Sequence, residues 1–266
     1  MHPIERLRYV ARASGAESGL LVRETAGALA AFRDDPAGLV TACRRIVSRH
    51  PTSGPVWWLC ARVLTAAEPM AEAWAAADDL DGDRTPVELA HALPEDATVC
   101  VVGWGDRVGE ALPHRGDLTV LVVDALGEGS GLVHRLERAD VTAWDVPPGG
   151  VGGAAAEADL VLLEAAADGP TAAAVAVAGS RAAAAVAHHA GVPVWLVGGA
   201  GRLLPRRLWD SLAGRLEAAC EPWDADEELV PLDLVDRLVG PTGPEPVPAG
   251  LRRTDCPVAA ELLREI

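Results

Sequence analysis

Thr98-Val-Cys-Val-Val-Gly-Trp-Gly105 is the stretch that decides the fold of this chain of 266 residues. Its β-branched run predicts a buried strand, and the glycines that follow predict a tight turn into a helix that opens at Asp106. A second apolar run ends at Asp124, so the order is strand, helix, strand, as in the first βαβ unit of an open α/β sheet. Backbone N–H groups at such a helix start bind anions, and glycine lets a ligand approach closely. The stretch therefore predicts a ligand site.

The composition excludes several chemistries. All 23 basic residues are arginine, and lysine, asparagine and glutamine are absent. The chain therefore has no lysine for a Schiff base or a P-loop and no N-glycosylation site. The formal net charge of −16 disfavours binding to nucleic acid or to an anionic membrane. The abundance of alanine, glycine, valine and leucine is typical of a GC-rich genome and indicates a bacterium.

The amino-acid sequence contains no pattern typical of a membrane span, a metal site or a cofactor site. Apolar runs reach only about eight residues, whereas a membrane-spanning helix needs roughly 20. The five cysteines are widely spaced and form no Cys-x-x-Cys pair, which indicates structural thiols in a reducing compartment. His188-His189 has no cysteine nearby, so we expect no zinc site. We expect a cytoplasmic protein without a metal or a cofactor.

The chain changes character near residue 85. In residues 1–85, apolar side chains recur at helical spacing between prolines, which predicts an N-terminal domain of about five helices. In residues 86–266, short β-branched runs alternate with helical stretches, which predicts a Rossmann-like, doubly wound and mostly parallel α/β sheet. The expected strands are 98–103, 118–124, 140–144, 159–164 and 193–198. The expected helices are 105–112, 129–138, 150–157, 180–190 and 204–219. The proline-rich segment after residue 220 is expected to extend over the surface and to end in a short helix at 259–266.

The glycine spacing leaves a dinucleotide-binding interpretation open. Gly103-x-Gly105-x-x-x-Gly109 is a variant of the dinucleotide fingerprint, and Asp124 follows Gly103 by 21 residues. The bulky Trp104 opposes this interpretation, because it stands where a pyrophosphate needs a close approach to the backbone. A Rossmann enzyme that uses NAD(P) or S-adenosylmethionine is therefore one alternative.

Several later segments resemble one family, in the family's own order. Val122-Val-Asp-Ala-Leu-Gly-Glu-Gly129 stands where that family has Glu-Ser-Arg-Pro followed by Glu-Gly. The family has a strand ending in Gly-Ala-Asp where this chain has Val161–Ala166. It has a helix opening with Lys-Ile-Gly-Thr where this chain has Val177–Ser180. Gly191–Leu196 follows as its Val-Pro strand, and Leu229–Asp236 resembles its Val-Pro-x-x-x-Val-Asp segment. The family contains the alpha, beta and delta subunits of translation initiation factor 2B and the methylthioribose-1-phosphate and ribose-1,5-bisphosphate isomerases. The resemblance implies an N-terminal helical domain followed by a Rossmann-like domain.

The departures from the family pattern fall on the isomerase chemistry. Gly103-Trp104 stands where the isomerases have their cysteine, and Cys100 lies inside the preceding strand. Their catalytic aspartate corresponds to Ala166, and the arginine of Glu-Ser-Arg-Pro corresponds to Leu126. Asp168 lies two positions beyond Ala166 and is the candidate catalytic residue, unless it only makes a turn with the glycine and proline that follow.

Candidate ligand-binding residues follow from the glycine turn and from the resemblance. Ser48-Arg49-His-Pro-Thr52 resembles the Arg-Pro-Thr that helps to bind phosphate in the isomerases, which implies a role for Arg49. Arg107 stands in the first turn of a predicted helix, where it binds a phosphate or pairs with Asp106 or Glu110. Ser180 opens another helix as a ligand contact or as an N-cap. The predicted ligand-binding residues are Arg49, Gly103, Trp104, Gly105, Arg107, Asp124, Gly179 and Ser180.

The resemblance favours a divergent initiation factor 2B-like protein that is a homodimer through its C-terminal domain. We expect it to bind a phosphorylated sugar or nucleotide between its domains and to have lost or altered the isomerase activity. An active aldose–ketose sugar-phosphate isomerase with relocated catalytic groups is the second alternative, beside the Rossmann enzyme. Neither nucleic acid nor a membrane is expected as a partner.

Overall fold

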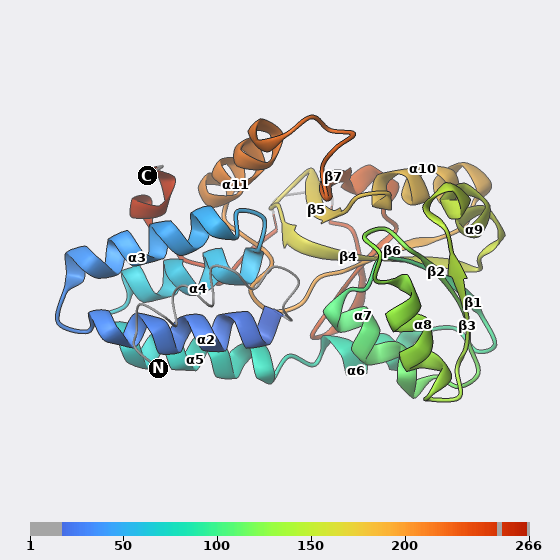
Figure 1. The fold of residues 1–266 in the computed structure, drawn as a ribbon, viewed down its shortest axis with the longest axis horizontal. Coiled ribbons are helices and arrows are strands. Elements are labelled where there is room, and N and C mark those ends of the chain that lie inside the picture. Colours follow the sequence, from blue (N-terminus) through green and yellow to red (C-terminus); the bar gives the residue numbers. More distant parts are fainter. Residues whose placement is uncertain (1–17, 249–251, 265–266) are drawn as a thin grey trace.

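The computed structural model describes residues 18–248 and 252–264, and it has a nine-stranded, mostly parallel sheet beside a group of helices (Figure 1). The strands are β1 (Thr98–Val102), β2 (Thr119–Val123), β3 (Thr142–Val146), β4 (Leu160–Asp168), β5 (Ala173–Val177), β6 (Val194–Val197), β7 (Glu227–Pro231), β8 (Arg237–Gly240) and β9 (Gly243–Pro246). The predicted fold class, helices followed by a Rossmann-like α/β sheet, is confirmed.

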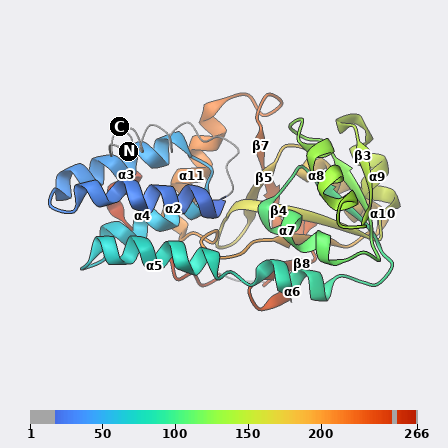
Figure 2. The ribbon, with the colours of Figure 1, turned by 60° about the horizontal axis from the view of Figure 1, so that its bottom comes forward.

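Helices α2 (Ser18–Leu29), α3 (Pro36–Arg49), α4 (Gly54–Thr65) and α5 (Pro69–Asp81) form the helical region and lie side by side in Figure 2. Helices α3, α4 and α5 each have a proline in the first turn, where its missing N–H costs no hydrogen bond. The carboxylate of Asp35 also caps α3 by accepting a hydrogen bond from the Gly38 N–H at 2.8 Å. The local sequence therefore determines where these helices begin.

The core of the helical region includes segments from the far end of the chain. Trp57 and Trp58 of α4 are buried at its centre. Helix α11 (Arg206–Ala219) buries Leu208 and Leu212 against them, and the C-terminal segment adds Leu262. Hydrogen bonds to the backbone carbonyls of residues 261 and 262 from Arg44 and Arg215 hold that segment in place. Residues after 205 are thus part of the helical core as well as of the sheet.

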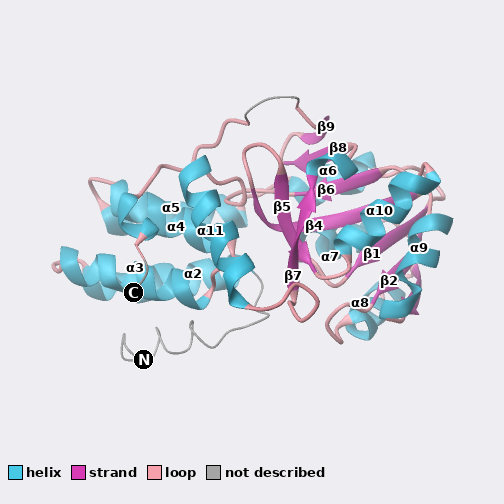
Figure 3. Ribbon diagram, turned by 90° about the horizontal axis from the view of Figure 1, so that it is seen from above, coloured by secondary structure: helices cyan, strands magenta, loops and turns pink. Residues whose placement is uncertain are grey.

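The sheet has the strand order β3-β2-β1-β4-β6-β8-β9, and all neighbours are parallel except β8 and β9. The direction in which the strand order runs reverses between β1 and β4, and ligands bind outside the carboxyl ends of the strands at such a point. Strand β4 is long enough to leave the parallel sheet and pair antiparallel with β5, which in turn pairs with β7 (Figure 3). This extension reaches the helical region, where Ala167 and Val175 join its core.

Helices cover both faces of the sheet. Helices α6 (Thr85–Ala92), α7 (Asp106–Ala111) and α8 (Gly129–Glu137) pack on one face, and α9 (Val151–Glu157) and α10 (Ser180–Ala190) pack on the other. Strands β1 and β4 are buried almost throughout, as the continuous apolar runs predict for parallel strands between two helical layers. The two remaining hydrophobic cores lie on the two faces of the sheet.

The expected strands and helices of residues 98–219 are present with their ends shifted by a few residues. The exception is β4, which runs four residues beyond the expected end at 164. Strands β5, β7, β8 and β9 are not among the expected strands, because each has only four or five residues and none has the continuous β-branched run that predicts a buried strand. A 3-10 helix at Ala260–Leu263 lies within the helix expected at 259–266, of which residues 265 and 266 are outside the described part. The division into residues 1–85 and 86–266 stays a prediction.

We predict that Leu262→Ala lowers the free energy of unfolding by about 2–4 kcal/mol, because this side chain is 1% exposed within the helical core. Chemical denaturation is the measurement. Val258→Ala is the matched control, since Val258 belongs to the same segment but is 43% exposed, and we expect it to cost less than about 1 kcal/mol. Equal costs for the two variants would show that the C-terminal segment is not part of the core.

Candidate functional site

A cavity of about 190 Å³ lies at the carboxyl end of β1 and beside Glu164, where β4 leaves its parallel neighbours, at the point where the strand order reverses. The helical region closes one side of it: the backbone N–H of Ser18 donates to the Asp106 carboxylate at 2.7 Å. The described residues that line the cavity are Ser18, Val102, Gly103, Trp104, Gly105, Asp106, Leu126, Glu128, Glu164, Ala165, Ala166, Val177, Arg202 and Glu227. Its position matches the expected ligand site of an open α/β sheet.

Glu164 of β4 occupies the start of helix α7. Its carboxylate accepts hydrogen bonds from the backbone N–H groups of Arg107 and Val108, each at 2.9 Å. Its other oxygen accepts a hydrogen bond from the Arg202 guanidinium at 2.8 Å. Free N–H groups and the helix dipole favour an anion at this position. The anion there is the chain's own carboxylate.

Three glycines, Gly105 of the opening stretch, Gly109 of α7 and Gly131 of α8, make room for side chains of this chain. A Cβ at Gly105 would lie 2.7 Å from the Cβ of Glu164. A Cβ at Gly109 would lie 2.6 Å from the indole nitrogen of Trp104, and one at Gly131 would lie 2.8 Å from its ring. In dinucleotide-binding proteins such glycines admit the pyrophosphate. Here the same space holds Glu164 and Trp104, which is an observation against the dinucleotide interpretation.

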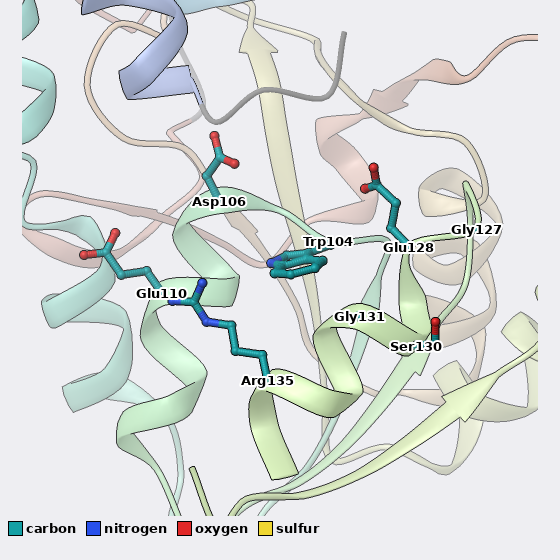
Figure 4. Close-up of a pocket in the computed structure, with 8 residues that line it drawn as sticks. All are labelled: Trp104, Asp106, Glu110, Gly127, Glu128, Ser130, Gly131 and Arg135. Carbon is teal, nitrogen blue, oxygen red and sulfur yellow. The ribbon is translucent and has the colours of Figure 1, made fainter. Parts of the chain in front are cut away.

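Trp104 lines the cavity and also a second hollow of about 630 Å³, which Figure 4 shows. Trp104 is 38% exposed, and its indole lies between the side chains of Asp106 and Glu128. Glu110 and Arg135 line the outer hollow. An exposed aromatic face among hydrogen-bonding groups is typical of a small-molecule site.

Arg107 is directed away from the cavity and into the protein. Its side chain is 7% exposed, with Nε 3.2 Å from the Asp83 carboxylate and Nη2 donating to the Leu80 carbonyl at 3.3 Å. Asp83 also accepts hydrogen bonds from Thr85 and from the Ala200 N–H. Arg107 is therefore not among the described lining residues, and it ties the end of α5 to the sheet.

Four other predicted ligand residues also lie outside the described cavity lining. Asp124 accepts a hydrogen bond from the Gly129 N–H at 3.0 Å and so caps α8. Gly179 has φ +93° before α10, and Ser180 is buried with no hydrogen-bond partner for its hydroxyl among the described residues. Arg49 is exposed at the end of α3. Of the predicted set, Gly103, Trp104 and Gly105 line the cavity.

Asp168 lies at the far end of β4, where the C-terminal segment covers it. Arg252 binds both of its carboxylate oxygens, one of them at 2.6 Å, and the side chain of Asp168 is 6% exposed. Burial raises the pKa of Asp168, and Arg252 opposes this shift. Asp168 is not among the described residues of the cavity; it lines a separate hollow with Arg202 and Arg252.

Sequence reasoning missed the charged residues that define the cavity. Glu164 lies within Val161–Ala166, a segment whose resemblance to the family draws attention to Ala166 rather than to this carboxylate. Arg202 follows a glycine-rich turn, and Glu227 lies in a segment with no predicted strand. A glutamate inside an otherwise apolar strand was the available signal for Glu164, because charged residues are rarely buried unless they are paired.

Burial raises the pKa of two carboxyl groups in the cavity, those of Glu164 and Glu227. Burial raises the pKa of Glu164, Arg202 opposes this shift, Asp106 adds to it, and the backbone N–H groups of Val108 and Arg107 oppose it. Burial also raises the pKa of Glu227, and a hydrogen bond from Thr52 opposes it. Thr52 belongs to the segment that resembles Arg-Pro-Thr, so that segment meets the cavity through its threonine.

Residues 18–248 and 252–264 bring together no group of three or more histidine, cysteine or acidic side chains suited to a metal ion. No helix within the same ranges is long and apolar enough to cross a membrane.

Comparison with known proteins gives a fold likeness without a sequence match. No protein-family model matches the sequence, and no curated protein does. The structure resembles translation initiation factor eIF-2B of Pyrococcus horikoshii with a TM-score of 0.77 and 13% identity, over 92% of this chain and 97% of that one. It resembles eIF2B beta of Chaetomium thermophilum with a TM-score of 0.72 and 16% identity, over 92% and 88% of the two chains.

A third similar structure is the tetrameric eIF2B-beta2-delta2 complex of C. thermophilum, with a TM-score of 0.74 and 18% identity over 92% of this chain and 90% of that one. At these identities the likeness establishes the fold. The resemblance found in the sequence is therefore confirmed at the level of the fold, with low identity as in a divergent relative.

We predict that Glu227→Gln becomes more stable relative to the unchanged protein as the pH rises from about 4 to 8. The folded-state pKa of Glu227 is raised, so its contribution to stability is fully present below the unfolded-state pKa and is lost as the pH rises through the folded-state value. Glutamine keeps the shape and cannot ionise. Denaturant unfolding at several pH values is the measurement. Glu137→Gln, at an exposed position of α8, is the control, and an equal pH trend in both variants would contradict the prediction.

Proposed function

We propose that this chain is a divergent relative of the initiation factor 2B subunits that binds a small ligand in the cavity and has lost the isomerase reaction. One observation carries the proposal: the pocket at the carboxyl end of β1 and beside Glu164 of β4 is present, but its lining has other residues at the isomerase positions. Gly103-Trp104 stands in place of the cysteine, and Ala166 in place of the aspartate. The chain retains a place for a ligand without those two reactive groups.

The nearest cysteine in the sequence does not replace the lost one. Cys100 is fully buried within β1, and burial raises its pKa to about 12. Its thiol therefore stays protonated at neutral pH, and the thiolate is the nucleophilic form. Isomerisation of a sugar phosphate needs an acid and a base next to the reacting carbons, and Cys100 supplies neither.

The negative charges of the cavity favour binding of the sugar part of a ligand over binding of its phosphate. Its described lining has four carboxylates, Asp106, Glu128, Glu164 and Glu227, and one guanidinium, which already pairs with Glu164. Carboxylates accept hydrogen bonds from ribose hydroxyls, as acids after the second strand do in dinucleotide-binding sheets. We propose a phosphorylated sugar or nucleotide whose sugar enters the cavity against Trp104 and whose phosphate remains outside.

Two other functions need rearrangements that the geometry opposes. An isomerase that uses Asp168 requires this carboxylate to leave Arg252 and reach the cavity. An NAD(P) enzyme requires a pyrophosphate at the start of α7, where Glu164 lies. The ligand-binding experiment that follows distinguishes both functions from the proposed one.

The proposal extends to the oligomeric state and the cellular compartment of the protein. We propose a homodimer in the cytoplasm of a bacterium. A tetrameric complex among the similar structures supports association, and so do Trp144 and Trp223, which are 62% and 84% exposed. Exposed tryptophans are common at protein interfaces.

We predict that ribose 5-phosphate or AMP raises the melting temperature, whereas NAD(P)H and S-adenosylmethionine do not. Stabilisation follows from binding to the folded state alone and reaches about 2.7 kcal/mol at a hundredfold excess over Kd. Glu128→Gln removes a charged acceptor for a sugar hydroxyl and should weaken binding about tenfold. Glu137→Gln removes the same charge from α8 outside the cavity and should leave binding unchanged.

Other outcomes would overturn the proposal in different ways. Stabilisation by NAD(P)H or S-adenosylmethionine would favour the Rossmann enzyme. Conversion of ribose 1,5-bisphosphate, followed by nuclear magnetic resonance and abolished by Asp168→Asn, would favour an active isomerase. No stabilisation by any of these compounds would remove the assignment of a phosphorylated sugar.

A further inference from the structure

A third hollow, of about 350 Å³ and separate from the two beside Trp104, lies at the carboxyl ends of β6 and β8. Three arginines line it: Arg202 follows β6, and Arg252 and Arg253 belong to the C-terminal segment. The carboxylates among its described lining residues are Asp168 and Glu245. The hollow is thus richer in arginine than in carboxylate, in a chain whose formal net charge is −16.

Two of these arginines have a buried donor that the protein does not use. The terminal nitrogens of Arg202 donate to the Gly198 carbonyl at 2.9 Å and to Glu164 at 2.8 Å. Those of Arg252 bind the Asp168 carboxylate. The Nε–H of each arginine is buried and has no hydrogen-bond partner among the described residues. A buried N–H without an acceptor costs free energy, so an acceptor in the hollow would be stabilising.

Arg202 is the better candidate of the two arginines for a buried donor, because only 2% of the residue is exposed. Its terminal nitrogens are fixed by two partners on different segments, so the orientation of the planar guanidinium is set before a ligand arrives. The remaining Nε–H is therefore held in one orientation and can donate to an oxyanion with little loss of side-chain entropy.

Arg253 supplies an accessible charge at the same hollow. Its side chain is exposed, and within the described ranges no hydrogen bond or ion pair engages it. The turn between β8 and β9 also lines the hollow, and the space in which a Cβ of Gly240 or Gly243 would stand is open, with no atom within 4 Å. The absence of side chains at these two positions lets a ligand approach the backbone of the turn.

We propose that this hollow binds a small oxyanion of the phosphate class. The exposed guanidinium of Arg253 attracts the anion, and the unused Nε–H groups of Arg202 and Arg252 provide buried donors. Asp168 then serves to hold Arg252 in place. The proposal goes beyond the sugar site described above: Arg202 borders both cavities, but the two sets of carboxylates and the expected ligands differ.

Inorganic phosphate is the probe, titrated into the full chain at constant ionic strength and followed by isothermal titration calorimetry. Arg253→Gln should weaken binding about tenfold, the size expected for loss of one charged hydrogen bond. Arg138→Gln is the matched control, because it removes the same charge from an exposed position at the end of α8 and should leave the affinity unchanged.

A variant that is expected to tighten phosphate binding, rather than weaken it, makes the test independent of any loss of folding. Glu245→Gln removes a carboxylate from the rim and should tighten phosphate binding by about threefold or more. Absence of phosphate binding at about 10 mM, equal affinities for Arg253→Gln and Arg138→Gln, or no tightening by Glu245→Gln would overturn the proposal. Unphosphorylated ribose tests the other cavity separately, so failure of one site is distinguishable from failure of the other.

Discussion

The carboxylate of Glu164 is the constraint on which the carboxyl edge of this sheet depends. A charge buried at Glu164, where β4 leaves its parallel neighbours, must be compensated, and the chain does so with the backbone N–H groups that open α7 and with the guanidinium of Arg202. The geometry of the first loop follows from this contact. Gly105 is needed because Glu164 packs against its backbone, and α7 starts where its N–H groups meet the carboxylate. A second buried pair, Arg107 with Asp83, connects the same loop to the end of α5.

This arrangement gives the cavity its chemical character. The helix start that usually accepts a ligand anion is occupied from inside, and Asp106, Glu128 and Glu227 add further negative charge. The site is therefore better suited to hydroxyl groups than to phosphate. The arginines near the cavity serve structural contacts, because Arg107 and Arg202 each pair with a carboxylate of the chain. Positive charge that is free to meet a ligand lies farther along the sheet edge, at Arg253.

Much of the fold could be predicted from the sequence because its signals are local. Apolar runs between glycines and prolines located β1, β2, β4 and β6 and the helices between them. The roles of the site residues depend on distant segments and could not be predicted in this way. Arg107 pairs with a residue 24 positions earlier, and Asp168 pairs with one 84 positions later. The glycine spacing of the opening stretch was informative about close approach, but it could not specify whether a ligand or Glu164 makes that approach.

A double-mutant cycle on Glu164 and Arg202 tests the central claim most directly. Glu164→Gln leaves a buried guanidinium without its carboxylate, and Arg202→Leu leaves the carboxylate without its guanidinium, so each change alone should cost about 3–5 kcal/mol of unfolding free energy. The double variant buries neither charge. Denaturant unfolding at pH 7 should therefore give a coupling energy of about 2 kcal/mol or more between the two positions. Costs that add to within about 0.5 kcal/mol would contradict the account, because Glu164 and Arg202 would then not stabilise each other.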